Sequence, residues 1–217
     1  MITLSATIKK LDGSFINLNK TNLLSLECSI FDRRNTSSPS WGVISNNGNI
    51  KFVDTKGDIK TLANNRNLKK GMEVSILIKN TLEDATKVIN NFVTSNWGYD
   101  NNNRRVSVNL TDELEELQSI LITPTELTEY TFLKKDNVSF EKIYKYLHSL
   151  TPSKFKFLQF ESLDADTRLV LQTRKNSYNI YQDHNLWAAW NSFGIATLTR
   201  IFKDLDGNTI VKHSEGN

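Results

Sequence analysis

The stretch from Met72 to Ile122 most constrains the fold, because three strand patterns in it run directly into one amphipathic helix pattern. Alternating apolar residues predict strands in three segments: Met72–Ile78, Lys87–Trp97 and Arg104–Leu110. Short turns separate strands of this kind, and such neighbours pair antiparallel. The order therefore predicts a curled antiparallel sheet with a helix packed against it. The stretch contains no catalytic motif.

The predicted helix covers Thr111–Ile120, with Thr111 or Asp112 as its N-cap. Three leucines share one face of it: Leu114, Leu117 and Leu121. We expect this helix to plug the barrel-like sheet. The acidic run from Asp112 to Glu116 then forms its solvated face, which is a better interpretation than a pair of catalytic carboxylates.

Earlier segments add further strands. Period-2 alternation predicts them at Ile2–Ile8, Phe15–Leu18, Leu23–Phe31 and Asn49–Val53. Asp12-Gly13 is a hairpin signal, and Trp41–Ile44 leads into a predicted turn at Asn46–Gly48. Arg33–Ser40 is polar, contains Pro39 and is predicted to be a loop, and a short helix is one option for Ile59–Leu68.

The character of the chain changes from Pro124 onwards. Apolar spacing predicts helices at Phe140–Leu147, Leu163–Gln172 and His184–Phe193, the last capped by Asp183 and stopped by Gly194. A hairpin of Ile195–Lys203 and Thr209–Lys212 follows. The predicted class is α+β, with a β-barrel-like domain over residues 1–123 and a helical α+β domain ending in a hairpin over residues 124–217.

Composition excludes several classes of protein. The 217 residues carry a net charge of only +3, and their Lys and Arg residues are spread along the chain, so charge alone does not indicate nucleic-acid binding. No apolar run reaches the roughly 20 residues of a membrane span, so we expect no membrane anchor. The single cysteine, Cys28, alternates with Leu26 and Ile30 and is expected to be a small buried side chain. We expect synthesis and assembly in a cytoplasm.

The sequence offers little catalytic chemistry. The three histidines, His148, His184 and His213, lie far apart and accompany no nucleophile motif. The segment Asp204–Asn208 resembles the start of a calcium loop but fails its spacing, so a hairpin turn is the better interpretation. We predict no enzymatic activity, no cofactor and no metal.

Aromatic and basic residues flank the loop Gly98–Asn103, and they are the first candidate interaction residues: Trp97, Tyr99, Arg104 and Arg105. Such a mixture on a barrel can hold a single strand of nucleic acid. The alternative, which we favour, is that Trp97 packs at a strand end while the arginines face solvent. Trp41 is a further candidate, as a core or interface anchor.

Several segments together resemble a known family. They include Leu68–Ile78, which contains a G-x-x-V-x-I strand, and Arg105–Leu117, a strand followed by a D-x-L-x-x-L helix. The order of Leu26–Asp32, Pro39–Ile44, Gly48–Asp54, Phe92–Trp97, Phe140–Leu150 and Leu186–Ile210 fits as well. This order resembles the hub proteins of phage tails and baseplates, which include the N-terminal part of tail-associated lysins.

The resemblance implies a structural virion protein of the tail, assembled in the bacterial host cytoplasm. Hubs of this family carry two tube-type barrels, assemble as trimers with pseudo-sixfold symmetry, contact other tail and baseplate proteins, and link the tail tube to the tip. Their lumen passes DNA, which contacts the ring only transiently. This chain stops just after the hairpin at Val211, so we expect the front part of a hub or a shortened member. The alternative is a non-catalytic binding module, either an OB-like nucleic-acid binder or a carbohydrate-binding attachment protein.

Overall fold

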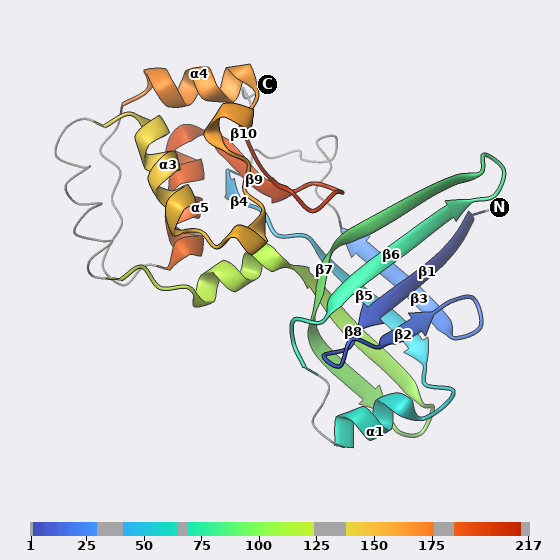
Figure 1. Ribbon diagram of the computed structural model, residues 1–217. Helices are drawn as coiled ribbons and strands as arrows, with labels where there is room; N and C mark the ends of the chain where they lie inside the picture. The colour runs from blue at the N-terminus through green and yellow to red at the C-terminus, as the bar shows by residue number, and fades with distance from the viewer. Residues whose placement is uncertain (1, 30–40, 65–68, 124–137, 176–184, 214–217) are drawn as a thin grey trace. The chain divides into compact units, whose positions relative to one another are not determined.

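The computed structural model describes residues 2–29, 41–64, 69–123, 138–175 and 185–213 (Figure 1). The chain forms two compact units. The first, here called the sheet unit, comprises Met1–Ile30, Asn46–Glu113 and Leu205–Gly207. The second, the helical unit, comprises Phe31–Ser45, Leu114–Asp204 and Asn208–Asn217. The predicted α+β class is confirmed, whereas the predicted domain boundary at residue 123 stays a prediction.

The sheet unit is built on one seven-stranded sheet in the order β2-β1-β6-β7-β8-β5-β3. Every neighbouring pair in it is antiparallel, as the alternation predicted. Its strands are β1 (Ile2–Lys9), β2 (Phe15–Leu18), β3 (Leu23–Ser29), β5 (Asn47–Val53), β6 (Glu73–Asn80), β7 (Ala85–Asp100) and β8 (Arg105–Asp112). Helix α1 (Asp58–Asn64) contributes Ile59 to the core of this unit.

Chain connectivity forces this sheet to curl. Its two outermost strands, β2 and β3, are consecutive in sequence and joined only by the turn Asn19–Asn22, which the bond from Leu23 N to Asn19 O closes at 2.8 Å. Six strand spacings in a flat sheet would span about 29 Å. The five steps from Leu18 to Leu23 reach at most about 18 Å even when extended. The sheet must therefore roll into a barrel-like form that brings its two outer strands together.

The concave face of the rolled sheet holds the core of the unit. Buried side chains alternate along the strands: Ala6, Ile8, Leu18, Ile50, Phe52, Val74, Ile76, Ile89, Phe92, Val106, Val108 and Leu110. Cys28 is half-buried against this cluster, and burial raises the pKa of its thiol. Period-2 alternation therefore predicted which face is buried. Cys28 packs against the core, but it is half-buried and not buried as expected.

The helical unit combines α3 (Phe140–Leu150), α4 (Ala165–Thr173) and α5 (Leu186–Thr197) with a small sheet. This sheet has the order β10-β9-β4, from β10 (Thr209–His213), β9 (Thr199–Lys203) and β4 (Gly42–Val43). Three 3-10 turns complete the unit: η1 (Glu113–Ser119), η2 (Ser153–Phe155) and η3 (Phe160–Ser162). Its core contains a cluster of aromatic rings, with Trp190 stacked on Phe157 at 4.5 Å and edge-on to Tyr144 at 5.4 Å between ring centroids.

The predicted helix over Thr111–Ile120 is wrong in type and in position. Thr111 and Asp112 end strand β8, and the following residues form the 3-10 helix η1. A 3-10 helix has three residues per turn, so Leu114, Leu117 and Ile120 align and pack into the core of the helical unit, whereas Leu121 is 69% exposed. Among the described residues, α1 packs in the sheet unit; it overlaps the segment Ile59–Leu68, where a short helix was one option, and begins one residue earlier at Asp58.

Three expectations around α5 and β4 also need correction. The N-cap of α5 is Asn185, whose side chain accepts from Ala188 N at 2.9 Å; the expected cap Asp183 lies outside the described residues, as does His184. Gly194 does not end α5, which continues to Thr197. A Cβ on Gly194 would meet Gly42 Cα at 2.6 Å, so glycine here permits close packing of α5 on β4.

Strand β4 pairs in parallel with β9, and therefore belongs to the helical unit and not to the N-terminal sheet. The predicted turn at Asn46–Gly48 is instead the start of β5, where Gly48 lies opposite Leu110. The predicted loop Arg33–Ser40 lies outside the described residues. The helices predicted over Phe140–Leu147 and Leu163–Gln172 are confirmed within a few residues as α3 and α4.

Candidate interaction surfaces

The residues predicted around the loop 98–103 lie on two different faces of the sheet. Trp97 is opposite Val108 and Tyr99 is opposite Val106, so both aromatic side chains point to the core side and pack against it. Arg105 is opposite Asp100 and points to the other face, as does Ser107 opposite Gly98. Arg104 lies in the β7–β8 turn with a positive φ of 50°. The pairing register therefore separates the aromatic side chains from Arg105.

Each aromatic residue has a polar anchor within the sheet unit. Trp97 Nε1 donates to Lys69 O at 3.3 Å. The Tyr99 hydroxyl donates to Asp54 Oδ2 at 3.5 Å, and the same carboxylate oxygen accepts from Lys60 N at 3.1 Å. Desolvation, with the nearby Asp54 carboxylate, raises the pKa of the Tyr99 hydroxyl. These half-buried rings connect the end of β7 to the segments beside α1, a packing role that the sequence alone also favoured for Trp97.

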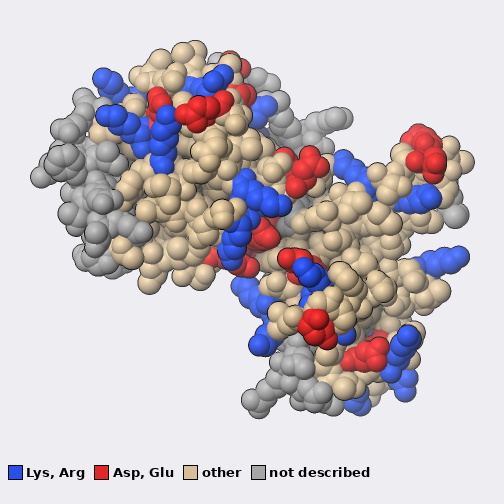
Figure 2. All heavy atoms as spheres, in the orientation of Figure 1, with Lys and Arg blue, Asp and Glu red and all other residues tan. Residues whose placement is uncertain are grey.

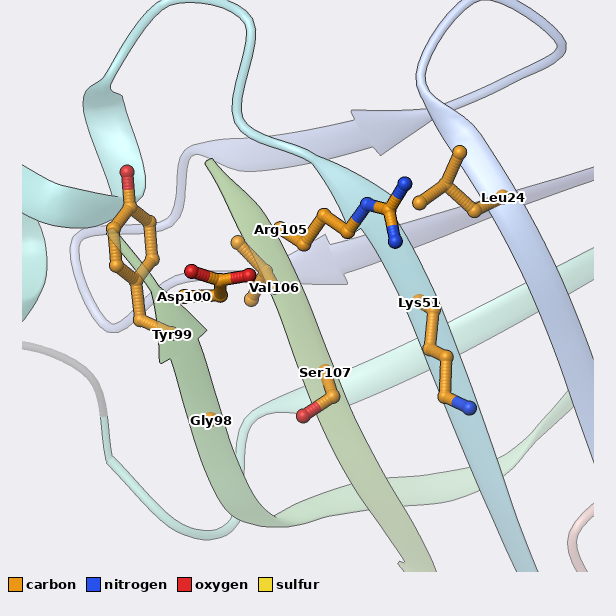
Figure 3. A pocket seen from close by; sticks show the side chains of 8 residues that line it. All are labelled: Leu24, Lys51, Gly98, Tyr99, Asp100, Arg105, Val106 and Ser107. Carbon is orange, nitrogen blue, oxygen red and sulfur yellow. The ribbon is translucent and has the colours of Figure 1, made fainter. Parts of the chain in front are cut away.

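The convex face of the sheet carries an open hollow of about 340 Å³ (Figure 3). Its lining residues come from β3, β5, β7 and β8: Leu24, Lys51, Gly98, Tyr99, Asp100, Arg105, Val106 and Ser107. Gly98 leaves the space that a side chain would occupy, since a Cβ there would meet Ser107 Oγ at 2.6 Å. In Figure 3 Arg105 reaches across β5 towards Leu24, whereas Tyr99 points away from both. The hollow offers two cationic side chains and a carboxylate for polar contacts, but no nucleophile paired with a base.

Asp100 is held by the turn that joins β7 to β8. Its carboxylate accepts from Asn103 Nδ2 and from Asn102 N, both at 2.9 Å. These bonds to the ionised form lower the pKa of Asp100. The turn thus keeps a negative charge beside Arg105 and reduces the positive potential of the hollow.

Trp41 belongs to the helical unit, whereas the other four candidates belong to the sheet unit. The Arg200 guanidinium carbon lies 5.6 Å from the centre of the Trp41 ring, a cation–π arrangement. Trp41 is half-buried. Its role as an interface anchor stays a prediction.

The remaining candidates for chemistry have structural contacts. In the described part of the chain, no cluster of three His, Cys, Asp or Glu side chains could hold a metal ion. Asp204 closes the β9–β10 turn by accepting from Asn208 N at 2.8 Å, which fits the predicted hairpin turn. His148 Nε2 lies 3.2 Å from Phe157 O.

Both positive and negative side chains are visible in Figure 2, in small groups separated by wide uncharged areas. This face carries no broad patch of one sign among the residues drawn in colour, in line with the net charge of +3. No helix in the described ranges is long and apolar enough to cross a membrane.

Two solved structures share this fold. The tail protein from Neisseria meningitidis MC58 matches over 96% of this chain with a TM-score of 0.50 at 11% identity, and the match covers 50% of that protein's chain. The 43 kDa tail protein of prophage MuSo2 from Shewanella oneidensis matches over 100% of this chain with a TM-score of 0.51 at 10% identity, covering 57% of its chain. This chain therefore spans about half the length of either structure. No protein-family model and no curated protein matches the sequence.

Proposed function

We propose that this chain is a structural protein of a phage tail, and that it forms a ring in the tail hub or baseplate that connects the tail tube to the tip and passes DNA. The observation that carries the proposal is the match of nearly the whole chain, both units included, to two proteins described as tail proteins. A shared fold alone is compatible with many functions, so the ring is the part that needs an experiment.

The physical character of the described residues supports a structural role. The sheet unit is a rolled sheet with an apolar core, and its aromatic candidates Trp97 and Tyr99 serve that core. The surface charges of Figure 2 are mixed in sign, which suits a channel for DNA, because a strongly basic lining would hold DNA by releasing its counterions. We infer that the protein has no enzymatic activity, acts in the virion tail after assembly in the host cytoplasm, and contacts itself and other tail proteins.

The first test is the mass of the purified chain in solution, by light scattering after size exclusion over a concentration series. We expect a discrete trimer or hexamer. A monomer at every concentration would contradict the ring. Negative-stain images of the assembled fraction should then show closed rings with an open centre, and open filaments would contradict closure.

The second candidate function is an OB-like binder of single-stranded nucleic acid, favoured by Lys51 and Arg105 lining the same hollow. Against it, Trp97 and Tyr99 point to the opposite face from Arg105, so stacking and charge contacts do not meet on one surface. Under the tail proposal, the protein shows no salt-sensitive binding of single-stranded DNA in fluorescence anisotropy. Tight binding lost in the double variant Lys51→Ala/Arg105→Ala would favour the binder instead.

A further inference from the structure

Strands β1, β6 and β7 extend beyond the rest of the sheet as a three-stranded arm. The β6–β7 hairpin and the start of β1 lie at the same end of it, where Ile2 pairs with Asn80 and Asn80 with Ala85 (Figure 1). Around its tip, residues 81–88 are all exposed. The arm is therefore held by its own ladders and stands largely in solvent.

Both sides of this arm are open edges. Strand β2 pairs with β1 only from Ala6 to Lys9, which leaves β1 residues 2–5 bonded to β6 alone among the described strands. Strand β8 pairs with β7 only from Phe92 onwards. Among the described strands, β7 residues 85–91 are therefore bonded to β6 alone. On the outer side of each edge, the backbone N–H and C=O groups of alternate residues have no neighbouring strand, among those described, with which to form hydrogen bonds.

Towards the tip of the arm, the two edges have few of the devices that normally prevent strand addition. Natural sheets protect an edge with charged residues, proline or a bulge. β1 residues 2–5 are Ile-Thr-Leu-Ser, with neither charge nor proline, and β7 residues 85–91 contain a single charge at Lys87. The register of β6 with β7 shifts by one residue between Ile89 and Phe92, so this bulge lies at the base of the arm and residues 85–89 precede it. Apolar side chains on the arm are exposed in addition: Ile2 at 67%, Leu4 at 39%, Leu82 at 86% and Val88 at 44%. Such edges and side chains are typical of a surface that another strand covers.

The outermost strands of the sheet are poorer candidates for this role. β2 and β3 are brought together by the turn Asn19–Asn22, so their outer edges face one another and leave little room for a strand from another molecule. The edges of the arm have no such neighbour among the described strands. A strand from a second molecule can therefore approach the arm from either side.

We propose that the β7 edge of one copy pairs with the β1 edge of the next copy, so that the arms of successive subunits form one continuous sheet around the ring. This inference rests on the proposed ring and identifies its contacts. β1 and β7 both run antiparallel to β6, so they point the same way, and copies related by rotation about the ring axis meet through a parallel β7–β1 junction. Two different edges form the contact, which makes it heterologous and able to close a ring.

Cysteine cross-linking in a Cys28→Ser background tests the pairing. Ser5 and Val88 both lie opposite Leu77, so they point to the same face of the arm but stand two strands apart. That separation is about 9.5 Å, too far for a disulfide within one chain. The double variant Ser5→Cys/Val88→Cys should therefore form a ladder of cross-linked oligomers under mild oxidation, ending at the size of the ring.

Mixed single variants fix the direction of the contact. Ser5→Cys mixed with Val88→Cys should cross-link, while each alone stays uncross-linked. Because the register is set by pairing, Thr3→Cys and Thr86→Cys, which share this face through Lys79, are combined in the same way to cover a two-residue slip. Cross-linking of one single variant with itself would overturn the heterologous junction. The control pair is Asn17→Cys on β2 with Ser25→Cys on β3.

A charge placed on an edge gives an independent readout. Val88→Lys should shift the mass from the ring to the monomer and leave the circular dichroism spectrum unchanged, because Val88 is exposed. Leu24→Lys, on β3 and similarly exposed, is the matched control and should still assemble. If the chain forms a ring but only the β2–β3 pair cross-links, the arm junction is wrong while the proposed function stands. If the wild-type chain is monomeric at every concentration, both fail.

Discussion

At the scale of single residues, short-range hydrogen bonds in the β7–β8 turn decide the electrostatics of the candidate hollow. Asp100 accepts from a side chain, Asn103, and from a backbone amide, Asn102. Both bonds are stronger to the ionised carboxylate and so lower the pKa of Asp100. The residue therefore stays negative beside Arg105 at neutral and mildly acidic pH.

We expect the NMR titration of Asp100 to have its midpoint below the usual value for aspartate. Asn103→Ala removes the side-chain donor and should move the midpoint back towards that value. Asn102→Ala is the matched control, since its backbone amide remains, and should leave the midpoint nearly unchanged. The pKa of Asp100 is lower in the folded protein than in the unfolded chain. Ionised Asp100 therefore stabilises the folded protein above the pKa of the unfolded chain, and this stabilisation is lost as the pH falls through the pKa of the folded protein. An unchanged midpoint in Asn103→Ala would contradict this account.

Gly194 gives a second prediction at this scale. In an open helix, Gly→Ala stabilises by about 1 kcal/mol. Here the new Cβ would meet backbone atoms, Gly42 Cα at 2.6 Å and Thr199 O at 2.9 Å, which cannot move aside cheaply. We expect Gly194→Ala to lower the free energy of unfolding by about 2 kcal/mol in urea denaturation. Its exposed neighbour gives the control, because Ile195→Ala should change that energy by less than about 1 kcal/mol.

At the scale of elements, the segment after β8 was expected to form an α-helix in the sheet unit. It forms the 3-10 helix η1, and its leucines pack in the core of the helical unit. Leu114 and Leu117 are fully buried in the helical unit, with Ile120 packed beside them. An α-helical period would have placed Leu121 with them instead. The 3-10 period of three residues places Ile120, and not Leu121, on the same side as Leu114 and Leu117.

This assignment predicts unequal effects of two leucine truncations. Leu117→Ala should lower the free energy of unfolding by about 2–5 kcal/mol, because it opens a cavity in a packed core. Leu121→Ala, at 69% exposure, should change it by less than about 0.5 kcal/mol. Equal losses in thermal or urea unfolding would restore the α-helical interpretation.

At the scale of the whole molecule, the two units have separate apolar cores. One lies within the rolled sheet and is mainly aliphatic, and the other lies among α3, α5 and β9 and combines aliphatic side chains with more aromatic rings. Each core is made by residues of its own unit. Local unfolding should therefore follow the units.

Hydrogen exchange followed by mass spectrometry tests this separation. Ile76→Ala, in the sheet core, should raise amide exchange in β1, β6 and β7 while α3 and α5 keep their protection. Leu147→Ala, in the helical core, should do the reverse. A uniform rise across both units in either variant would mean that the two cores unfold together.

Much of the fold followed from local pattern. Alternation predicted the strands from Ile2 to Leu110, their antiparallel pairing and their buried face, and the apolar period of α3 located that helix within a few residues. The candidate residues were less predictable. Tyr99 and Arg105 are close in sequence, but their faces depend on the register between β7 and β8, which a bulge between Thr94 and Asn96 shifts.

Local apolar patterns were enough to locate most of the strands and their apolar faces, because backbone geometry sets those periods within each segment. Contacts between distant segments explain why β4 pairs with β9, why η1 belongs to the helical unit, and why Gly194 lies inside a helix. The tertiary structure also decided where the β1 and β7 edges remain open, since that depends on how far β2 and β8 reach along them. These features are set by contacts between residues distant in sequence, which no local period encodes.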